Sequence, residues 1–341
     1  MVSTLKGAVV GFGRMGITHC AILNTHSLVS MAAVCDTSSF MVGNFQKHTG
    51  IPGFADALRM FDAVALDFVV VATPTPSHHQ IAREAFDRGV HVFVEKPLTL
   101  TASDSERLSL DAARAKLVNQ VGYVNRFNEV FVAVKEVLTS GTLGEVYHFR
   151  CDMCAPTVLR EPKGGWRGKR NTGGGCLMDF ASHGIDLIHF FFGAPDRIAG
   201  SAVRRIYSQE TEDAVYSTFL YHHGLSGHLA VNWSDESYRK PAYRIEFSGS
   251  NGRIAADQHG YRLYLRRSPA GSQYQSGWNV RHATDLNRPV RFYLRGNEFT
   301  SQLDYFIDKI RAGDTSNINS FASAAATDKT IQAILNDAGA A

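Results

Sequence analysis

A glycine-rich turn close to the N-terminus constrains the fold of this 341-residue chain more than any other feature. The apolar segment AVV leads into Gly11-x-Gly13-x-x-Gly16, and a helical pattern follows directly. With a strand before it and a helix after it, this spacing predicts a tight turn that brings the backbone close to a pyrophosphate at a helix N-terminus. We therefore expect the whole turn to contact a dinucleotide: Gly11, Phe12, Gly13, Arg14, Met15 and Gly16.

The second predicted strand, VSMAAVCD, ends at Asp36, twenty residues after Gly16. A carboxylate at this place accepts hydrogen bonds from both ribose hydroxyls of NAD and repels the 2′-phosphate of NADP. The residues that follow, TSSF, contain no Arg to pair with such a phosphate. The pattern favours NAD. A turn aspartate that closes the strand is the alternative, and use of NADP stays open.

Two more strand-to-loop units, LDFVVVATPTPSHHQIAREAF and RGVHVFVEKPLTL, continue the pattern. Their unbroken apolar runs are typical of strands buried on both faces, and their alternation with helices predicts a parallel sheet that binds ligands at its carboxyl edge. Lys96 stands at this edge, although a solvated surface lysine is the simpler alternative. The residues expected beside the cofactor are Thr73, Pro74, Glu95, Lys96 and at most one of the adjacent His78 and His79, with the other exposed.

The second half of the chain has a different pattern. After VGYVNRFN, the segment EVFVAVKEVLTSG predicts a helix. Alternating segments follow, among them VYHFRCDM, DRIAGSAVRRIYS, AVYSTFLYH, SGHLAVNWS, YRIEFSGS and RLYLRRS. They predict an open, mostly antiparallel sheet. The expected fold is therefore α/β: a Rossmann doubly wound domain over 1–123, then an α/β substrate-binding and oligomerisation domain over 124–341, whose last helix, about 320–337, packs near the first domain.

The segment GGGCLMDFASHGID, residues 173–186, combines three glycines with a predominantly apolar helix. At about 100° per residue, Asp179, His183 and Asp186 share one face of that helix. A solvated polar stripe is the alternative, but ionisable groups on a buried helix need a reason to be there. The glycines have no buried strand directly before them, so we expect them to let the backbone pass close to a substrate or nicotinamide.

Composition excludes several classes of protein. The net charge of +3 is spread along the chain, unlike the basic footprint of a nucleic-acid binder. No apolar run reaches the length of about 18–20 residues that a membrane span needs. The opening MVSTLKGAVVGFG enters a strand at once, so we expect no signal peptide and a cytoplasmic protein. Five cysteines fit reduced thiols, and Cys151 and Cys154 lie on opposite faces of a predicted strand, so we expect no metal site.

These motifs together resemble the Gfo/Idh/MocA family of NAD(P)-dependent oxidoreductases, which includes glucose–fructose oxidoreductase and inositol dehydrogenases. The resemblance rests on GFGRMG, VCD, VVVATPTPSHHQIA and VFVEKPL, and continues through GGWRGKRNTGGGCLMDFASHGIDLIHFFFG and IEFSGSNGRI. It covers nearly the whole chain. The E-K-P motif together with the later D-x-x-x-H is far more specific than the glycines alone. One departure is Ala181, where many members have Gly.

The resemblance implies that Lys96, Asp179 and His183 line a substrate pocket beside the nicotinamide, and that His78 lies near the cofactor. It also implies a sheet that mediates homodimer or homotetramer contacts. His183 is the expected acid or base, because its unperturbed pKa of about 6.5 lies near neutrality. Lys96 would stabilise the negative charge on the reacting oxygen, and Asp179 would hold a substrate hydroxyl or tune the imidazole. Asp186 would orient His183 or cap local structure.

The expected substrate is a sugar, a cyclitol or a sugar derivative, and the individual compound and the direction of reaction stay open. Side chains expected to frame the pocket besides the catalytic set are Tyr123, Asn125, Arg126, Trp166 and Arg167. The basic stretch of residues 160–170 either recognises an acidic group of the substrate or is a solvated loop. Two other functions remain: an NAD-dependent glycosidase or lyase that oxidises its substrate transiently, and a non-catalytic NAD-binding regulator.

Overall fold

The computed structural model describes residues 4–160, 165–286 and 288–339. The chain forms two compact units, each built from two stretches of sequence. The first unit comprises Met1–Val124 and Pro289–Ala325, and the second comprises Asn125–Arg288 and Ala326–Ala341.

The first unit contains a six-stranded parallel sheet in the order β3-β2-β1-β4-β5-β6. Its strands are β1 (Leu5–Val10), β2 (Val29–Cys35), β3 (Gly53–Phe54), β4 (Phe68–Val71), β5 (His91–Val94) and β6 (Asn119–Val121). Its helices are α1 (Arg14–Asn24), α2 (Ser39–Thr49), α3 (Ala57–Ala63), α4 (His78–Asp87), α5 (Ala102–Ala115) and α10 (Asn297–Ala312). This strand order is that of a Rossmann dinucleotide-binding fold.

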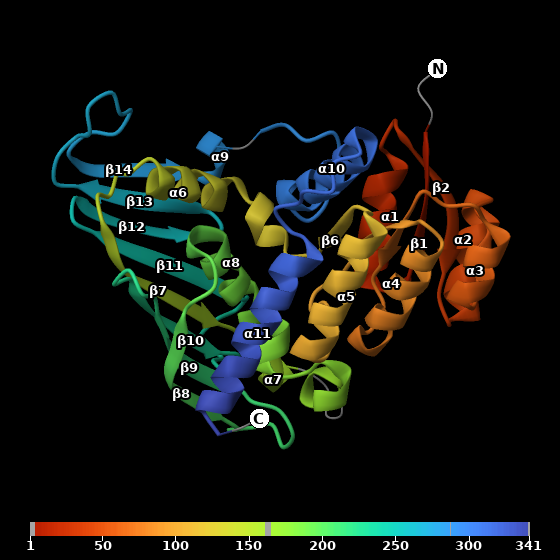
Figure 1. Cartoon of the computed structure of the whole chain (residues 1–341), viewed down its shortest axis with the longest axis horizontal. Helices are drawn as coiled ribbons and strands as arrows, with labels where there is room; N and C mark the ends of the chain where they lie inside the picture. Colours follow the sequence, from red (N-terminus) through yellow and green to blue (C-terminus); the bar gives the residue numbers. More distant parts are fainter. Residues whose placement is uncertain (1–3, 161–164, 287, 340–341) are drawn as a thin grey trace. The chain divides into compact units, whose positions relative to one another are not determined.

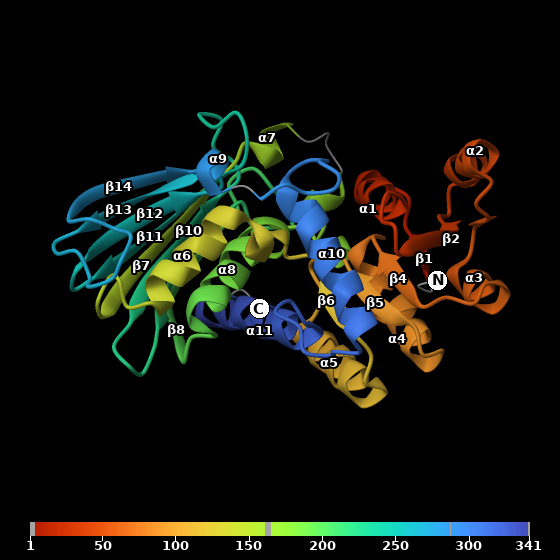
Figure 2. The ribbon, with the colours of Figure 1, turned by 90° about the horizontal axis from the view of Figure 1, so that it is seen from above.

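Both faces of this sheet are covered, which explains the unbroken apolar runs of its strands. Ala8 and Val10 pack in one core with residues of α3, α4 and α5. Val9, which points the opposite way, packs in a second core with residues of α1 and α10. Figure 2 shows α1 and α2 on one side of the sheet and α4 and α5 on the other. The first third of the chain is therefore doubly wound, as its sequence predicts.

Helix α10 belongs to the first unit, although everything after residue 123 was expected to lie in the second domain. Leu303, Phe306 and Ile307 are fully buried in the core formed with α1. The Phe306 ring meets the rings of Phe68 and Phe93 edge to face, each at 5.9 Å between centroids. The division at residue 124 therefore needs a correction, since Pro289–Ala325 return to complete the first core.

The second unit contains an eight-stranded sheet in the order β14-β13-β12-β11-β7-β10-β9-β8. All neighbouring strands are antiparallel except β7 and β10. The strands are β7 (Val146–Cys154), β8 (Arg197–Arg204), β9 (Ala214–Leu220), β10 (Ser226–Asn232), β11 (Ala242–Gly249), β12 (Gly252–Asp257), β13 (Gly260–Leu265) and β14 (Gly277–His282). The α/β fold class and the mostly antiparallel second sheet are thus confirmed.

Two of these strands, β12 and β14, were not among the predicted segments. Each has only six residues. Strand β14 lies at the edge of the sheet and has no fully buried residue, so its sequence GWNVRH lacks the apolar alternation that marks a half-buried strand.

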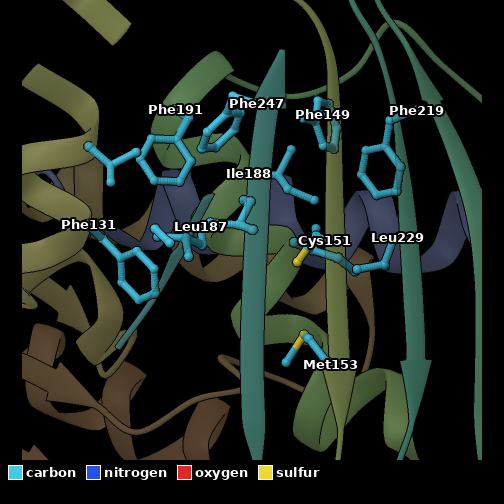
Figure 3. Close-up of a cluster of buried hydrophobic side chains, with 14 of the residues drawn as sticks. Phe131, Phe149, Cys151, Met153, Leu187, Ile188, Phe191, Phe219, Leu229 and Phe247 are labelled. Atoms are coloured by element: carbon cyan, nitrogen blue, oxygen red, sulfur yellow. The ribbon is translucent and has the colours of Figure 1, made fainter. Parts of the chain in front are cut away.

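Helices α6 (Glu129–Thr139), α8 (Ser182–Phe192) and much of α11 (Phe321–Asp337) lie on one face of this sheet (Figures 1 and 2). Figure 3 shows Phe149, Cys151 and Met153 of β7 pointing toward Leu187, Ile188 and Phe191 of α8. Alternate residues of β7 are exposed or half-buried on the other face, among them Cys154. Cys151 and Cys154 are therefore on opposite faces, as strand geometry requires.

The remaining elements are short: α7 (Thr157–Arg160), α9 (Ala283–Leu286), four 3₁₀ turns (Thr75–Ser77, Val124–Phe127, Trp166–Gly168 and Arg170–Thr172) and a π-helix (Cys176–Ala181). Within the described residues, no helix is both long enough and apolar enough to span a bilayer. In the same ranges, no cluster of three or more His, Cys, Asp or Glu side chains is arranged to hold a metal ion.

Candidate active site

The glycine turn between β1 and α1 is shaped by close backbone approaches. Gly11 has φ +89°, and a Cβ there would lie 2.6 Å from the backbone of Ala72 and Thr73. A Cβ on Gly16 would overlap the carbonyl oxygen of Gly11. Gly13 is the N-cap of α1 and has no side chain to accept the first N–H groups of the helix. The turn thus offers N–H donors at a helix N-terminus, which fits a pyrophosphate.

Asp36 lies directly after β2, and its carboxylate is oriented by two backbone N–H groups. Phe12 donates to Oδ2 at 2.6 Å, and Ser38 donates to Oδ1 at 2.8 Å. Each carboxylate oxygen accepts more than one hydrogen bond, so both can also accept from a ribose. Asp36 shares a hollow at the carboxyl edge of the sheet with residues from the β1, β2 and β4 ends, among them Gly11, Thr37, Thr73, Pro74 and Ser77. This hollow fits the adenosine half of a dinucleotide.

His78 joins the loop after β4 to the loop after β5. Its Nε2 lies 2.8 Å from the carbonyl oxygen of Thr73, and its Nδ1 lies 3.0 Å from that of Pro97. The side chain is fully buried, and this burial lowers its pKa. The position gives His78 a role in holding the two loops together, and its contact with a cofactor stays a prediction. His79, expected to be exposed, is half-buried.

Glu95 is held by His19, a residue of α1 that the sequence analysis did not single out. His19 Nε2 lies 2.6 Å from Glu95 Oε1, and the Lys96 N–H donates to Glu95 Oε2 at 3.2 Å. Burial raises the pKa of Glu95, but the hydrogen bond and the charge of His19 outweigh it and leave the pKa lowered. Glu95 therefore remains a carboxylate that fixes the backbone of Lys96. The Lys96–Pro97 peptide bond is cis.

In the second unit, Asp179 lies on the π-helix and accepts a hydrogen bond from Arg167. Arg167 Nε lies 2.8 Å from Asp179 Oδ2, and both side chains are partly exposed. The guanidinium of Arg167 lies over the ring of Trp166, 4.5 Å from its centroid. Arg167 and Trp166 were expected in the pocket; the structure brings Arg167 to Asp179 and the Trp166 ring to Arg167.

His183 lies on the first turn of α8, directly after the π-helix. Its ring is half-buried and meets the Tyr243 ring edge to face, with 6.3 Å between centroids. Burial and the charge of Asp179 raise the pKa of Tyr243, so that hydroxyl stays protonated. The uniform α-helix expected over residues 179–186 is wrong, because the π-helix changes the rotation per residue before α8 begins. Such π turns are frequent at functional sites.

Asp186 is paired with Arg126 and not with His183. Arg126 Nε donates to Oδ2 at 2.8 Å, and its second nitrogen donates to Oδ1 at 2.6 Å. Both side chains are at most 7% exposed. A buried bidentate pair of this kind fixes α8 against the turn before α6. The hypothesis that Asp186 orients His183 therefore needs correction.

Three residues expected to frame the substrate pocket are buried. Tyr123 has no exposed surface, and Asn125 and Arg126 are 3% and 6% exposed. Asn125 accepts a hydrogen bond from Gln258 at 3.2 Å. These three side chains are buried in the ligand-free chain, and the substrate contacts expected of them stay a prediction.

The basic stretch before the π-helix is only partly described. Lys163 lies outside the described residues, and α7 ends at Arg160. Lys169 and Arg170 are exposed. Whether the stretch binds an acidic group stays a prediction.

Two of the three glycines before the π-helix, Gly174 and Gly175, approach this chain's own atoms. A Cβ on Gly174 would overlap the Arg167 carbonyl oxygen, and one on Gly175 would overlap the carboxylate of Glu212. We expected them to make room for a substrate or nicotinamide; the close neighbours are instead the loop that carries Arg167 and a buried glutamate. Glu212, like His19, gave no signal in the sequence because its partners are distant along the chain.

Comparison with known protein families assigns both halves of the chain. The model described as "Oxidoreductase family, NAD-binding Rossmann fold" matches residues 5–123, and "GFO/IDH/MocA C-terminal domain" matches residues 131–255. The chain belongs to the Gfo/Idh/MocA family. The resemblance inferred from the E-K-P and D-x-x-x-H motifs is thereby confirmed.

Curated members of the Gfo/Idh/MocA family are similar over part of the chain. The rhizopine catabolism protein MocA of Rhizobium meliloti is 30% identical over 188 residues, which are 54% of this chain and 56% of that protein. An NADP⁺-dependent scyllo-inositol 2-dehydrogenase of Bacillus subtilis is 29% identical over 64% of this chain and 61% of its own length. The chain thus spans a little over half the length of these relatives.

Solved structures share the Gfo/Idh/MocA fold over nearly the whole chain. Levoglucosan dehydrogenase, solved with NADH and levoglucosan, superposes with a TM-score of 0.86 at 18% identity, covering 99% of this chain and 98% of its own. At this identity the likeness establishes the fold alone.

Proposed function

We propose that this chain is an NAD-dependent dehydrogenase that transfers a hydride between the nicotinamide and a hydroxyl or keto carbon of a sugar, a cyclitol or a sugar derivative. The observation that carries the proposal is the position of two half-buried groups four residues apart: Asp179 lies on a π-helix and His183 on the α-helix that continues it. Lys96, after β5 in the Rossmann unit, is the third member of the set that the family motif specifies.

His183 is the proposed acid or base. When bound, the nicotinamide accepts or donates the hydride at its C4 carbon. Oxidation of an alcohol also requires removal of the hydroxyl proton, and an imidazole does this near neutral pH. The Lys96 ammonium would hydrogen-bond the same oxygen and stabilise its negative charge. Asp179 is oriented by Arg167 and would accept a hydrogen bond from a substrate hydroxyl.

NAD is the proposed cofactor because the Asp36 carboxylate lines the hollow at the end of β2, where a ribose would be bound. A carboxylate repels the additional phosphate of NADP. The similar scyllo-inositol dehydrogenase uses NADP⁺ by its name, and the superposed levoglucosan dehydrogenase was solved with NADH, so family membership does not select between them. The choice of NAD therefore depends on Asp36.

The substrate class is supported by the names of the relatives and by the chemistry of the second unit. An inositol dehydrogenase and a levoglucosan dehydrogenase both act on polyhydroxylated rings. In this chain, Trp166 is 43% exposed and contacts Arg167, which in turn binds Asp179. An aromatic face next to a hydrogen-bonding pair suits such a ring.

A homodimer or homotetramer is proposed through the uncovered face of the eight-stranded sheet. Tyr216, Tyr264 and Trp278 are between 39% and 51% exposed on strands of this sheet. Exposed aromatic side chains of this kind are typical of interfaces. Light scattering on the purified protein should give two or four times the chain mass of 37.5 kDa, and Trp278→Asp should lower it. A mass of one chain would contradict the proposal.

The direct test of the activity is a screen of cyclitols, aldoses, uronates and nucleotide sugars with NAD, followed by the absorbance of NADH. We expect at least one polyol to be oxidised. Tight NADH binding without turnover of any polyol would contradict the proposal, and cleavage of a glycoside without net NADH would assign the chain to transient oxidation instead.

A further inference from the structure

A buried carboxylate lies against the start of the π-helix that carries Asp179. Glu212 is 5% exposed and directly precedes Asp213 and β9. Its Oε1 accepts a hydrogen bond from the Leu177 N–H at 2.8 Å, and its own carbonyl oxygen accepts one from the Cys176 N–H at 3.0 Å. One residue, 35 positions along the chain, thus binds two successive N–H groups of the first turn.

Gly175 makes this contact possible. Its φ of +103° is a conformation that side chains other than glycine rarely adopt, and a Cβ there would overlap Glu212 Oε1. The Gly175 N–H donates to the Arg167 carbonyl oxygen at 2.9 Å. Gly175 therefore joins the loop that carries Arg167 to the π-helix, while leaving space for the glutamate.

Burial of the ionised Glu212 carboxylate is unfavourable. Burial raises its pKa, while the hydrogen bond from Leu177 and the charge of Arg170 oppose this increase. Asp213, its neighbour, opposes ionisation further, although its own carboxylate is occupied by the N–H groups of Ile206, Tyr207 and Ser208. A carboxylate in such a place is tolerated only with specific hydrogen-bond partners.

We propose that Glu212 is a positioning residue, which sets the orientation of Asp179 relative to His183 by holding the first turn of the π-helix. π-Helices are rare and occur mostly as single turns next to or within α-helices. Without the Glu212 carboxylate, the Leu177 N–H is released, while the Cys176 N–H keeps its bond to the backbone carbonyl of residue 212. The segment is then free to rewind toward an α-helix, which rotates Asp179 about the helix axis. The inference rests on the proposed function only in assigning Asp179 and His183 to the reaction.

The test compares Glu212→Gln with Glu212→Ala. Gln retains an oxygen at the same distance from the backbone and should keep kcat within about threefold, whereas Ala should lower kcat about tenfold to a hundredfold, the range that a small displacement of catalytic groups produces. Gly175→Ala, which displaces the same carboxylate, should lower kcat similarly. The matched control is Glu210→Ala, an exposed glutamate two residues earlier in the same loop. NADH binding, followed by fluorescence, should be unchanged in all four variants.

A second readout does not require turnover. Histidine labelled with ¹³C at Cε1 gives one NMR signal per ring, and the His183→Ala spectrum identifies that of His183. Glu212→Ala should shift or broaden the His183 signal, and Glu212→Gln should leave it in place. If the wild type oxidises no polyol, the proposed function fails. The comparison of the His183 signal in wild type, Glu212→Gln and Glu212→Ala still decides whether Glu212 positions the segment.

Two outcomes would overturn the inference. A folded Glu212→Ala protein with wild-type kcat and an unchanged His183 signal would show that the contact has no effect on the site. Equal loss in Glu212→Gln and Glu212→Ala would assign the effect to the charge of Glu212 and not to its hydrogen bond with Leu177.

Discussion

His183 and Asp179 carry the proposed chemistry, and each is placed by neighbours of different kinds. His183 packs against the Tyr243 ring, and Asp179 is held by the guanidinium of Arg167. In the Rossmann unit, Glu95 fixes the backbone of Lys96 and is itself held by His19. At the scale of single residues, the reactive groups thus depend on partners that have no reactive role of their own.

Replacing His183 tests the proton-transfer role directly. We expect His183→Ala to lower kcat by about 10²–10⁴-fold, because general acid–base catalysis contributes that much, while NADH binding in the other unit is unaffected. Steady-state kinetics with the best polyol and a fluorescence titration of NADH measure the two quantities. His222→Ala is the control, since that side chain is 91% exposed. A near-normal kcat in the His183 variant would refute the assignment.

Asp36 should determine which dinucleotide binds. Asp36→Asn retains an oxygen acceptor for the Phe12 N–H but removes the charge that repels a 2′-phosphate. We expect the ratio of NADPH to NADH dissociation constants to fall about tenfold, the equivalent of ~1.4 kcal/mol. Fluorescence titrations with both dinucleotides measure it. The control is Asp67→Asn, which lies before β4 at the amino edge of the sheet and should leave the ratio unchanged. An unchanged ratio in Asp36→Asn would contradict the role of Asp36 in selecting NAD.

At the scale of elements, α8 is held on one side by the Arg126–Asp186 pair and on another by α11. His189 of α8 has its Nε2 3.1 Å from the Thr330 hydroxyl of α11. Burial, followed by the charge of Arg126, lowers the pKa of His189 to about 3. The ring is therefore neutral in the folded protein near neutral pH.

This neutral histidine should make the second unit sensitive to acid. The unfolded chain binds a proton at His189 below about pH 6.5, whereas the folded chain binds one only near pH 3. The free energy of unfolding is therefore unaffected by His189 above pH 6.5 and decreases as the pH falls below it. The loss approaches ~1.4 kcal/mol per pH unit. Chemical unfolding between pH 7 and 5 measures it. His189→Gln should reduce this slope and His222→Ala should not; equal slopes in His189→Gln and wild type would contradict the prediction.

At the scale of the whole molecule, the first unit is discontinuous in sequence. The sheet of residues 5–121 has one face completed by α10, which returns after the entire second sheet. Phe306 is the largest fully buried side chain that α10 contributes. Without α10, the apolar rings of Phe68 and Phe93 would be exposed to water, so the first third of the chain should not be stable by itself.

Two proteins test this dependence. A fragment of residues 1–124 should be unfolded or aggregated by circular dichroism and should not bind NADH. The same fragment joined by a flexible linker to residues 289–325 should be folded and should bind NADH. In the full chain, Phe306→Ala should lower the free energy of unfolding of the first unit by about 3–5 kcal/mol. A folded, NADH-binding 1–124 fragment would show that α10 is dispensable.

Local patterns in the sequence were sufficient for the doubly wound sheet, the glycine turn, Asp36 after β2, and the motif residues Lys96, Asp179 and His183. Each depends on residues close together in the chain: strand alternation, a turn that only glycine permits, or a short motif. The π-helix, the Arg126–Asp186 pair, the His19–Glu95 contact and the return of α10 were decided by tertiary structure. The hydrogen bonds that hold these features join residues between 35 and 182 positions apart along the chain. The π-helix also depends on a backbone that departs from a regular α-helix. No spacing in the sequence encodes such contacts, because they exist only once the cores bring distant segments together.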